Sequence, residues 1–322
     1  MHAIEHAYIR SKDGLPFSDS AFTLYQGLSK AGIPVTWFTD LDAEVLPNLT
    51  PSTLVNSGVG DVRKAVQALP YSRPPEFPTI PDCIEPLMGR RVWKSTMGEI
   101  RKDSAWPVFV KPEQHKLFTG YVIQDFGDLI KTAHIPDETV IWAQEPVEFL
   151  SEYRGFIHWD KLVGLRHYAG DSTIFPESEV ISWAQRALAR VMPLPTAYSI
   201  DLGVLPTGKT VVVEINDAFA LGPYGLPWNL YAPMVCDRWL EMSAGPNEFA
   251  KYLVTRFLDR KITKQQFMNR FPCYLDHEHE DYAVSSAHLI WCEYTSWNDA
   301  PDDWLYATLY NELRGSGYYT RL

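Results

Sequence analysis

The clearest hydrophobic pattern in the chain is a pair of apolar runs separated by a short turn. Residues 198–205 and 211–217 are rich in β-branched and other apolar positions, which predicts two buried strands. Residues 206–209, with a proline and a glycine, predict the turn between them. On the second strand, Glu214 and Asn216 lie two positions apart, so their side chains leave the same face. If the strands pair as a hairpin, Asp201 comes near both of them.

The polar positions on these two strands have the chemistry of a metal site. Carboxylate and carboxamide oxygens are hard ligands of the kind that Mg²⁺ prefers. Asp201, Glu214 and Asn216 supply both kinds of oxygen. The pattern therefore predicts a magnesium site, and the alternative is a core strand with one acidic residue at its exposed end.

Residues 1–88 alternate between helical and strand patterns, which predicts a small, mostly parallel sheet. Apolar spacing predicts helices over 18–31 and 61–69, and strands over 33–38 and up to residue 55. The turn with Gly58 and Gly60 could cradle a phosphate, but it lacks a third glycine, and a plain strand-to-helix turn is the better interpretation. The proline-rich residues 70–86 predict an extended linker.

Residues 89–145 contain the basic positions expected of a phosphate site. Residues 89–94 are the most basic short run; it either contacts phosphate through Lys94 or is a solvated helix start. An apolar strand over 108–110 leads into Lys111, where a compact positive charge suits a phosphate. The loop 113–120, with Lys116, joins this strand to another over 121–123, and 140–147 predicts a further strand.

Residues 149–168 predict a hairpin with a turn at 160–161. Glu152 and Arg154 share one face of its first strand, and Arg166 on the second strand could face the same way. Two neighbouring arginines repel each other unless an anion lies between them. The alternative is a pair of surface arginines on a half-exposed sheet. A helix over 178–192 has the apolar spacing of a packing element.

The C-terminal residues 251–322 are the least informative part of the sequence. Helices are expected over 249–258 and 263–271, and the acidic and histidine residues at 276–281 form either a metal site or a solvated loop. The aromatic-rich end, from Trp291 to Tyr310, indicates a small helical domain or a subunit contact. The oligomeric state is left open, with a homodimer as one option.

Composition narrows the class of protein. The 322 residues are 46% hydrophobic, as in a globular chain, and no apolar run reaches the roughly 20 residues that span a bilayer. A net charge of −11 argues against general nucleic-acid binding. Cys83, Cys236, Cys273 and Cys292 are scattered, which favours reduced thiols over a disulfide framework. The N-terminus lacks an apolar signal core, so a cytoplasmic location is expected.

These motifs together resemble the ATP-grasp superfamily. Lys111-Pro112, the segment 144–147, Glu152, Asp201 and the Glu214–Asn216 strand occur in that family's order, with a spacing similar to D-alanine–D-alanine ligase. The sequences around Arg154 and Arg166 look like a clade, often phage-encoded, that is named for two arginines and a lysine. The resemblance covers about residues 1–245. It implies an α/β fold with an N-terminal pre-ATP-grasp domain (1–88), an ATP-grasp domain in two subdomains (89–145 and 146–250), and a helical appendix (251–322).

The resemblance also implies roles for single residues. Those implied to contact the phosphates, adenine and ribose of ATP are Lys94, Lys111, Lys116, Glu145, Val147 and Glu152, and those implied to bind Mg are Asp201, Glu214 and Asn216. Many ATP-grasp ligases have an arginine two residues before the metal aspartate. Here that position is Ser199, so the resemblance assigns the catalytic charge to Arg154 and Arg166. The glycine-poor loop 113–120 is a second departure from the family.

The implied reaction is ATP-dependent joining of a carboxylate and an amine, or a peptide, through an acylphosphate. This chemistry needs positioning and charge neutralisation, which two lysines, two arginines and a metal site supply. The glycine- and proline-rich loop 217–228 is either a wall of the substrate site or a structural turn. Two alternatives remain open: a phosphotransferase on the same fold, and a nucleotide-binding module without turnover.

Overall fold

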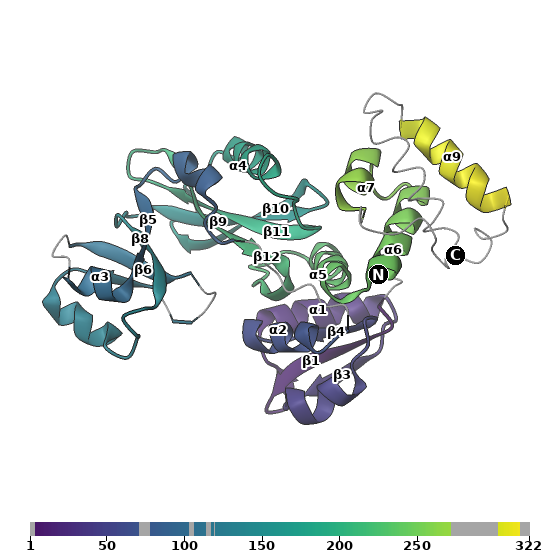
Figure 1. Ribbon diagram of the computed structural model, residues 1–322, viewed down its shortest axis with the longest axis horizontal. Helices are drawn as coiled ribbons and strands as arrows, with labels where there is room; N and C mark the ends of the chain where they lie inside the picture. Colours follow the sequence, from purple (N-terminus) through teal and green to yellow (C-terminus); the bar gives the residue numbers. More distant parts are fainter. Residues whose placement is uncertain are drawn as a thin grey trace.

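The computed structural model describes residues 4–70, 78–102, 106–113, 117–118, 120–271 and 302–315. Three four-stranded sheets carry most of this part of the chain, and helices pack beside them (Figure 1). The predicted mixed α/β class is therefore confirmed. Lys116, Cys273, Cys292, the 276–281 cluster and the aromatic residues at 291–297 lie outside the described residues.

The N-terminal sheet is built around β1 (His6–Lys12), which is parallel to β3 (Val35–Phe38) and β4 (Thr53–Asn56). A two-residue strand, β2 (Leu15–Pro16), pairs antiparallel with its end. The mostly parallel sheet was predicted, but its central strand was missed. The strand does carry the alternation of buried and less buried positions that is typical of β-structure, with Ala7 and Ile9 as its buried positions.

Two helices cover the N-terminal sheet. Helix α1 (Asp19–Lys30) lies within the predicted range of 18–31; Ser18 caps its start, and Gly32 follows its end with a φ of +72°. Helix α2 (Val59–Gln67) begins two residues earlier than predicted. A methyl group added at Gly27 of α1 would overlap Cβ of Ala232, so α1 lies directly against α5 (Trp228–Ser243).

The small sheet is antiparallel, in the order β5-β8-β6-β7. Its strands are β5 (Val92–Thr96), β6 (Val108–Pro112), β7 (Tyr121–Ile123) and β8 (Val140–Gln144), and α3 (Met97–Lys102) follows β5. The solvated helix start considered for residues 89–94 is wrong, because this segment enters β5 and pairs with β8. The prediction of an extended linker over 70–86 is wrong in part, because residues 82–87 form a 3-10 helix.

The large sheet is antiparallel, in the order β10-β9-β11-β12. Its strands are β9 (Ser151–His158), β10 (Lys161–Gly170), β11 (Ala197–Val204) and β12 (Thr210–Asp217), so both predicted hairpins are confirmed. Helix α4 (Glu179–Ala189) packs on one face, where its Ile181 and Leu188 meet Ile157, Ile200 and Val212 of the sheet. That apolar face leaves the opposite face for the polar residues described below.

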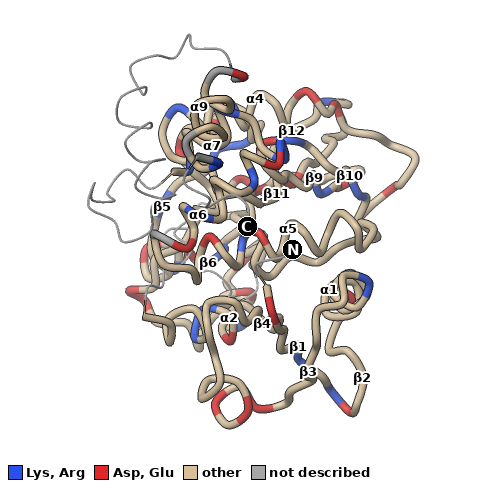
Figure 2. The backbone as a smooth tube through the Cα atoms, turned by 90° about the vertical axis from the view of Figure 1, so that its right-hand side faces the viewer, with Lys and Arg blue, Asp and Glu red and all other residues tan. Residues whose placement is uncertain are grey.

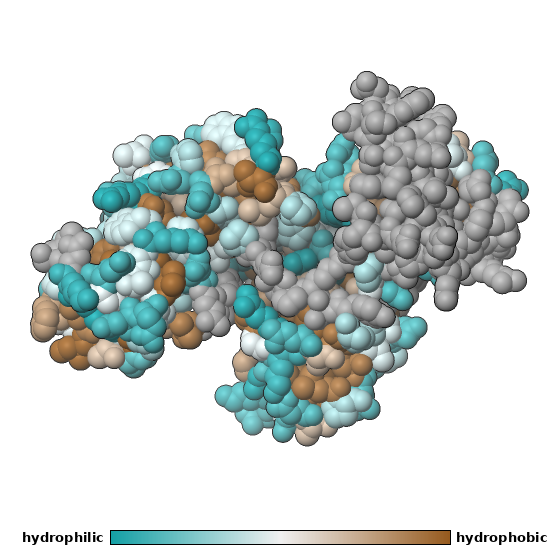
Figure 3. All heavy atoms as spheres, viewed as in Figure 1, coloured by the Kyte–Doolittle hydropathy of each residue, from teal (hydrophilic) through white to brown (hydrophobic). Residues whose placement is uncertain are grey.

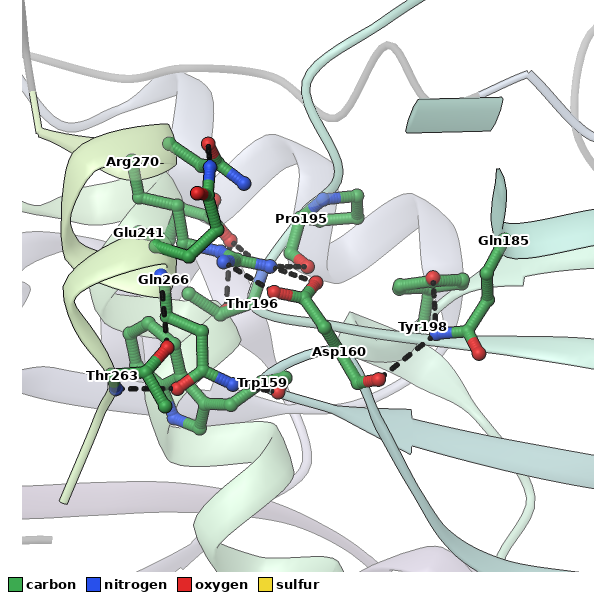
Figure 4. Close-up of polar contacts among 12 residues, drawn as sticks. Trp159, Asp160, Gln185, Pro195, Thr196, Tyr198, Glu241, Thr263, Gln266 and Arg270 are labelled. Carbon is green, nitrogen blue, oxygen red and sulfur yellow. Dashed lines mark hydrogen bonds and ion pairs between the residues drawn. The ribbon is translucent and has the colours of Figure 1, made fainter. Parts of the chain in front are cut away.

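The C-terminal helices α6 (Pro246–Leu258), α7 (Lys264–Arg270) and α9 (Asp302–Gly315) share a core of their own. They join the large sheet at the β9–β10 turn (Figure 4). Arg270 donates to Asp160 at 2.6 and 3.0 Å and to the Pro195 carbonyl at 3.2 Å, and Gln266 donates to the Trp159 carbonyl. Because α6 begins at Pro246, it crosses the domain boundary predicted at residue 250.

The surface is mostly hydrophilic on the face drawn in Figure 3, with separate brown apolar patches over the small sheet and the N-terminal sheet. The most exposed large apolar side chains are Phe126 and Ile130, at 74% each, in the 3-10 helix that follows β7. Among the described residues, no helix is long and apolar enough to cross a membrane.

Asp237 on α5 is the buried residue that ties these parts together. It accepts hydrogen bonds from His158 at 2.8 Å, Trp159 at 2.6 Å and Tyr252 at 2.5 Å. Burial alone would raise the pKa of Asp237, but His158, Arg256 and Tyr252 outweigh burial and lower it to about 2. One carboxylate therefore links the large sheet to both α5 and α6.

We predict that Asp237→Asn lowers the free energy of unfolding by about 3 kcal/mol, because it leaves buried donors and a cation without their anion. Denaturant unfolding measures the change. Asp303→Asn is the matched control: Asp303 pairs with Arg260 at 2.8 Å but is exposed, so its loss costs under about 1 kcal/mol. Equal losses in the two variants would contradict the prediction.

Candidate active site

Four charged residues form one row across the large sheet. Glu214 on β12 lies opposite Asp201 on β11, Asp201 lies opposite Arg154 on β9, and Arg154 lies opposite Arg166 on β10. Opposite residues of antiparallel strands send their side chains to the same face. The row therefore puts two acids beside two bases on the face away from α4, and Figure 2 shows both charge types along these strands. The sequence predicted that Asp201 lies near Glu214 and that Arg154 lies near Arg166, but not that Asp201 lies opposite Arg154.

The charges in the row are paired closely. Arg154 holds Asp201 with two hydrogen bonds, from Nε to Oδ1 at 2.8 Å and from Nη2 to Oδ2 at 2.6 Å. Lys111 reaches over from the small sheet, with Nζ 2.8 Å from Oε2 of Glu214. Asn216 donates to Oε1 of Glu214 at 2.9 Å. The three residues predicted to bind metal therefore lie together, with Lys111 and Arg154 beside them.

The two acids of the row differ in their pKa. Burial alone would raise the pKa of Glu214, but Lys111, Asn216 and Arg154 outweigh burial and lower it to about 2. Burial raises the pKa of Asp201 to about 6, despite the two hydrogen bonds from Arg154. Glu214 is thus the more firmly ionised of the two carboxylates.

A cavity of about 320 Å³ lies beside the row, between the small and large sheets. Its volume is within the range of small-ligand pockets. The lining residues are Arg90, Phe109, Lys111, Val122, Gln144, Glu145, Pro146, Val147, Phe149, Glu152, Val213 and Glu214. Five of the predicted site residues are therefore brought to one cavity. Sequence reasoning missed its apolar walls, although Phe109 precedes Lys111 by two positions and so shares its face.

The segment from Gln144 to Phe149 joins the two sheets at the edge of this cavity. The carboxylate of Glu145 accepts from the Arg91 amide at 2.9 Å, and the Glu145 amide donates to the Arg91 carbonyl at 3.0 Å. The side chain of Glu145 is thus used to hold the start of β5. Any contact between Glu145 and a base in the cavity would have to come from its backbone carbonyl.

Glu152 connects the cavity to the loop 217–228. Its Oε2 accepts from the Tyr168 hydroxyl at 2.9 Å, and Tyr168 stacks on Tyr224 with ring centroids 5.1 Å apart. The Arg154 guanidinium lies 5.0 Å from the Tyr224 ring. Tyr224, at φ +44° and followed by Gly225 at φ +78°, is 45% exposed. The Tyr224 ring therefore lies beside the charged row, which is the placement expected if the loop is a wall of the site. Sequence reasoning had selected this loop, but not the contact of its tyrosine with Tyr168.

Lys94 lies apart from this cavity. Its Nζ is 2.5 Å from Oε1 of Glu113 and 5.0 Å from the Trp142 ring centre, and it lines a second cavity of about 380 Å³. Lys94 and Lys111 lie opposite Trp142 on either side. Two strand spacings separate them, which is about 10 Å. The structure therefore places the two predicted phosphate lysines on one face of the small sheet but in different cavities.

Arg166, at the end of the row, has no acidic partner among the described residues. Within the described part of the chain it makes no ion pair, and its buried Nε has no hydrogen-bond partner. A buried donor in that state favours an anionic ligand. This observation supports the predicted anion between the two arginines.

The donor set fits a hard divalent cation such as Mg²⁺. Asp201, Glu214 and Asn216 offer two carboxylates and an amide oxygen on facing strands, as such an ion requires. No group of three or more His, Cys, Asp or Glu side chains that could hold a metal gathers in the described residues, so this site offers two carboxylates and one amide. A cation bound here would compete with Lys111 and Arg154 for the same oxygens.

Comparison with protein families gives this site its class. Residues 87–234 match an ATP-grasp domain family, the second family of the clade named for two arginines and a lysine, and they contain the whole row and the cavity beside it. This part of the chain belongs to that family of ATP-grasp domains, so the predicted resemblance is confirmed. No curated protein matches the chain.

Solved structures similar to the chain include N5-carboxyaminoimidazole synthetase from Staphylococcus aureus, with 10% identity and a TM-score of 0.48 over 73% of this chain and 77% of that one. D-alanine–D-alanine ligase from Bacillus anthracis, solved with ATP, has 14% identity and a TM-score of 0.45 over 73% and 96%. L-amino acid ligase from Bacillus licheniformis has 11% identity and a TM-score of 0.45 over 73% and 74%.

We predict that acid destabilises the wild-type protein more than Glu214→Gln. The folded-state pKa of Glu214 is lowered from 4.5 to about 2, so its ionised form stabilises the fold above pH 4.5 and this contribution is lost as the pH falls towards 2. Urea unfolding at about pH 5 and about pH 3 measures the two losses. Equal losses would show that Glu214 is not held ionised by its neighbours.

Proposed function

We propose that this protein is an ATP-dependent ligase that joins a carboxylate to an amine, or to a peptide, through an acylphosphate. The observation that carries the proposal is the charged row, which begins at Glu214 beside the cavity and ends at the unpaired Arg166. Such a row has an acidic end for metal-bound phosphates and a basic end for a second anion. Both substrates of a ligase would then meet on one face of one sheet.

The cavity between the sheets would hold the nucleotide. Phe109, Val122 and Phe149 offer apolar walls for adenine, and the backbone at Glu145 and Val147 lies at its rim. Glu152, which Tyr168 holds in place, would accept from the ribose hydroxyls. The proposal includes the division of the chain into residues 1–88, 89–250 and 251–322.

The phosphates would extend from the cavity towards the row. Lys111 would leave Glu214 for a phosphate oxygen when Mg²⁺ binds Asp201, Glu214 and Asn216. The metal would supply charge neutralisation between the phosphates. Lys94 would contribute only if it left Glu113.

The chemistry would proceed in two displacements. A substrate carboxylate oxygen attacks the γ-phosphorus, the bond to the β-phosphate oxygen breaks, and ADP leaves. An amine then attacks the acyl carbon, inorganic phosphate leaves, and the amine proton passes to solvent. Arg154 and Arg166 would neutralise the transferring phosphoryl group and the carboxylate, a role that Ser199 cannot perform. The Tyr224 loop would limit the access of water.

We expect ADP release from Mg-ATP to require both a carboxylate and an amine. The assay presents amino acids, polyamines and short peptides singly and in pairs. Release with one acceptor alone would contradict the ligase and indicate a phosphotransferase. ATP binding without release across the panel would indicate a nucleotide-binding module. Glu214→Gln, which removes a metal-binding charge, should reduce release at least about 100-fold in protein that circular dichroism shows to be folded at the assay temperature.

We expect Arg154→Lys to lower kcat by about 100-fold, because an ammonium keeps the charge but loses the bidentate geometry. The KM for ATP should change by less than about threefold, because Arg154 lies beyond the nucleotide cavity. Steady-state kinetics separate the two parameters. Arg186→Lys on the exposed side of α4 is the control. A raised KM with an unchanged kcat would place Arg154 in the nucleotide site instead.

A further inference from the structure

Arg90 lies where the small and large sheets meet, and it bonds to both. Its Nε donates to Oε1 of Gln144, the last residue of β8, at 2.8 Å. Its Nη1 donates to the carbonyls of Met88 at 3.0 Å and Val212 at 3.1 Å, and its Nη2 donates to the carbonyl of Val213 at 2.9 Å. One guanidinium therefore spans the joint between the sheets.

The strand segment that Arg90 contacts is a β-bulge. The register between β11 and β12 shifts at Asp201–Leu202, where Val213 is the extra residue on β12. A bulge interrupts the strict alternation of a strand, so that the carbonyls of Val213 and the preceding residue can both face Arg90. The residue that follows the bulge is Glu214. The bulge therefore sets the direction in which this carboxylate leaves the strand.

Strand β12 forms one edge of the large sheet, so its outward N–H and C=O groups need partners from outside the sheet. Residues 78–80 supply one bond, from the Ile215 amide to the Thr79 carbonyl at 2.9 Å. Arg90 supplies two more at the bulge. A carbonyl left without a donor here would carry the full cost of its desolvation.

Arg90 also belongs to the nucleotide cavity, where its guanidinium lies 5.6 Å from the Phe149 ring centre. Burial lowers the pKa of Arg90 to about 10, which Glu214 and Glu152 oppose, so the side chain is charged at neutral pH. Four of its five N–H donors are used by protein acceptors. Little donor capacity is left for a ligand, so contact with a phosphate is not its main use.

We propose that Arg90 is a positioning residue of the nucleotide site, which fixes the bulge that aims Glu214 at the metal and fixes the small sheet against that strand. The proposal rests on the proposed nucleotide site. A guanidinium is needed, because its planar fork reaches two carbonyls and Gln144 at once, whereas a lysine ammonium is a point charge. Arg90 would thus influence ligand binding indirectly, by orienting Glu214 and by fixing the angle between the two sheets.

The test measures the affinity of the full-length protein for ADP, with and without Mg²⁺, in parallel with its melting temperature. In the wild type, Mg²⁺ should tighten ADP binding. In Arg90→Lys, this tightening should shrink at least about tenfold, because Glu214 is no longer aimed, and the affinity for metal-free ADP should fall at least about threefold, because the bond to Gln144 is lost as well. Arg101→Lys is the matched control, since Arg101 also donates to two backbone carbonyls, those of Thr132 and Ile135, but away from the cavity.

A second variant keeps the proposal testable if Arg90→Lys does not fold. Gln144→Leu removes the bond to the small sheet and leaves the two bonds to β12. It should weaken ADP binding at least about threefold with and without Mg²⁺, because only the fit between the sheets is relaxed. An unchanged Mg²⁺ effect in a folded Arg90→Lys, or unchanged ADP binding in Gln144→Leu, would overturn the proposal. A wild type that binds no ADP at all would instead overturn the proposed function.

Discussion

The pairing of Arg154 with Asp201 is the interaction on which the rest of the site depends. Both side chains are almost completely buried, at 8% and 1% exposure, and each would be costly to bury alone. Their bidentate geometry offsets that cost only if β9 and β11 keep one register. A slip of either strand by one residue would turn its own charge towards the apolar core under α4 and leave the other charge on the opposite face. The charge pair and the apolar face therefore select the same strand alignment.

This alignment decides what the neighbouring strands can offer. β12 adds Glu214 on one side of the pair and β10 adds Arg166 on the other. The side-chain charges therefore change from negative at β12 to positive at β10. The small sheet meets only the negative end, through Lys111. The positive end faces the loop that carries Tyr224. In the proposed function, this polarity separates the side that would bind the nucleotide from the side that would bind the second substrate.

Local pattern was enough to predict the parts of the site that lie within hairpins. The strands of Asp201 and Glu214, and those of Arg154 and Arg166, are close in sequence, and short turns set their alignment. The same pattern could not predict Arg90, whose partners on β12 lie 122 and 123 positions away. Nor could it show that Lys94 pairs with Glu113 instead of joining Lys111, because that depends on how three strands are ordered. Strand β1 was missed because its alternation is short and carries polar residues such as His6 and Arg10.

The contact of Gly27 with Ala232 has a mechanical consequence. Since α1 and α5 approach so closely that a methyl group would not fit between them, the N-terminal unit has little freedom to slide over the helix that follows β12. The small sheet, in contrast, is connected to the large sheet by two chain crossings, near residues 88–91 and 145–150, and by the side chains of Arg90 and Lys111. The few connections leave the small sheet more freedom to tilt than the N-terminal unit has, and Arg90 lies where the small sheet joins the large one.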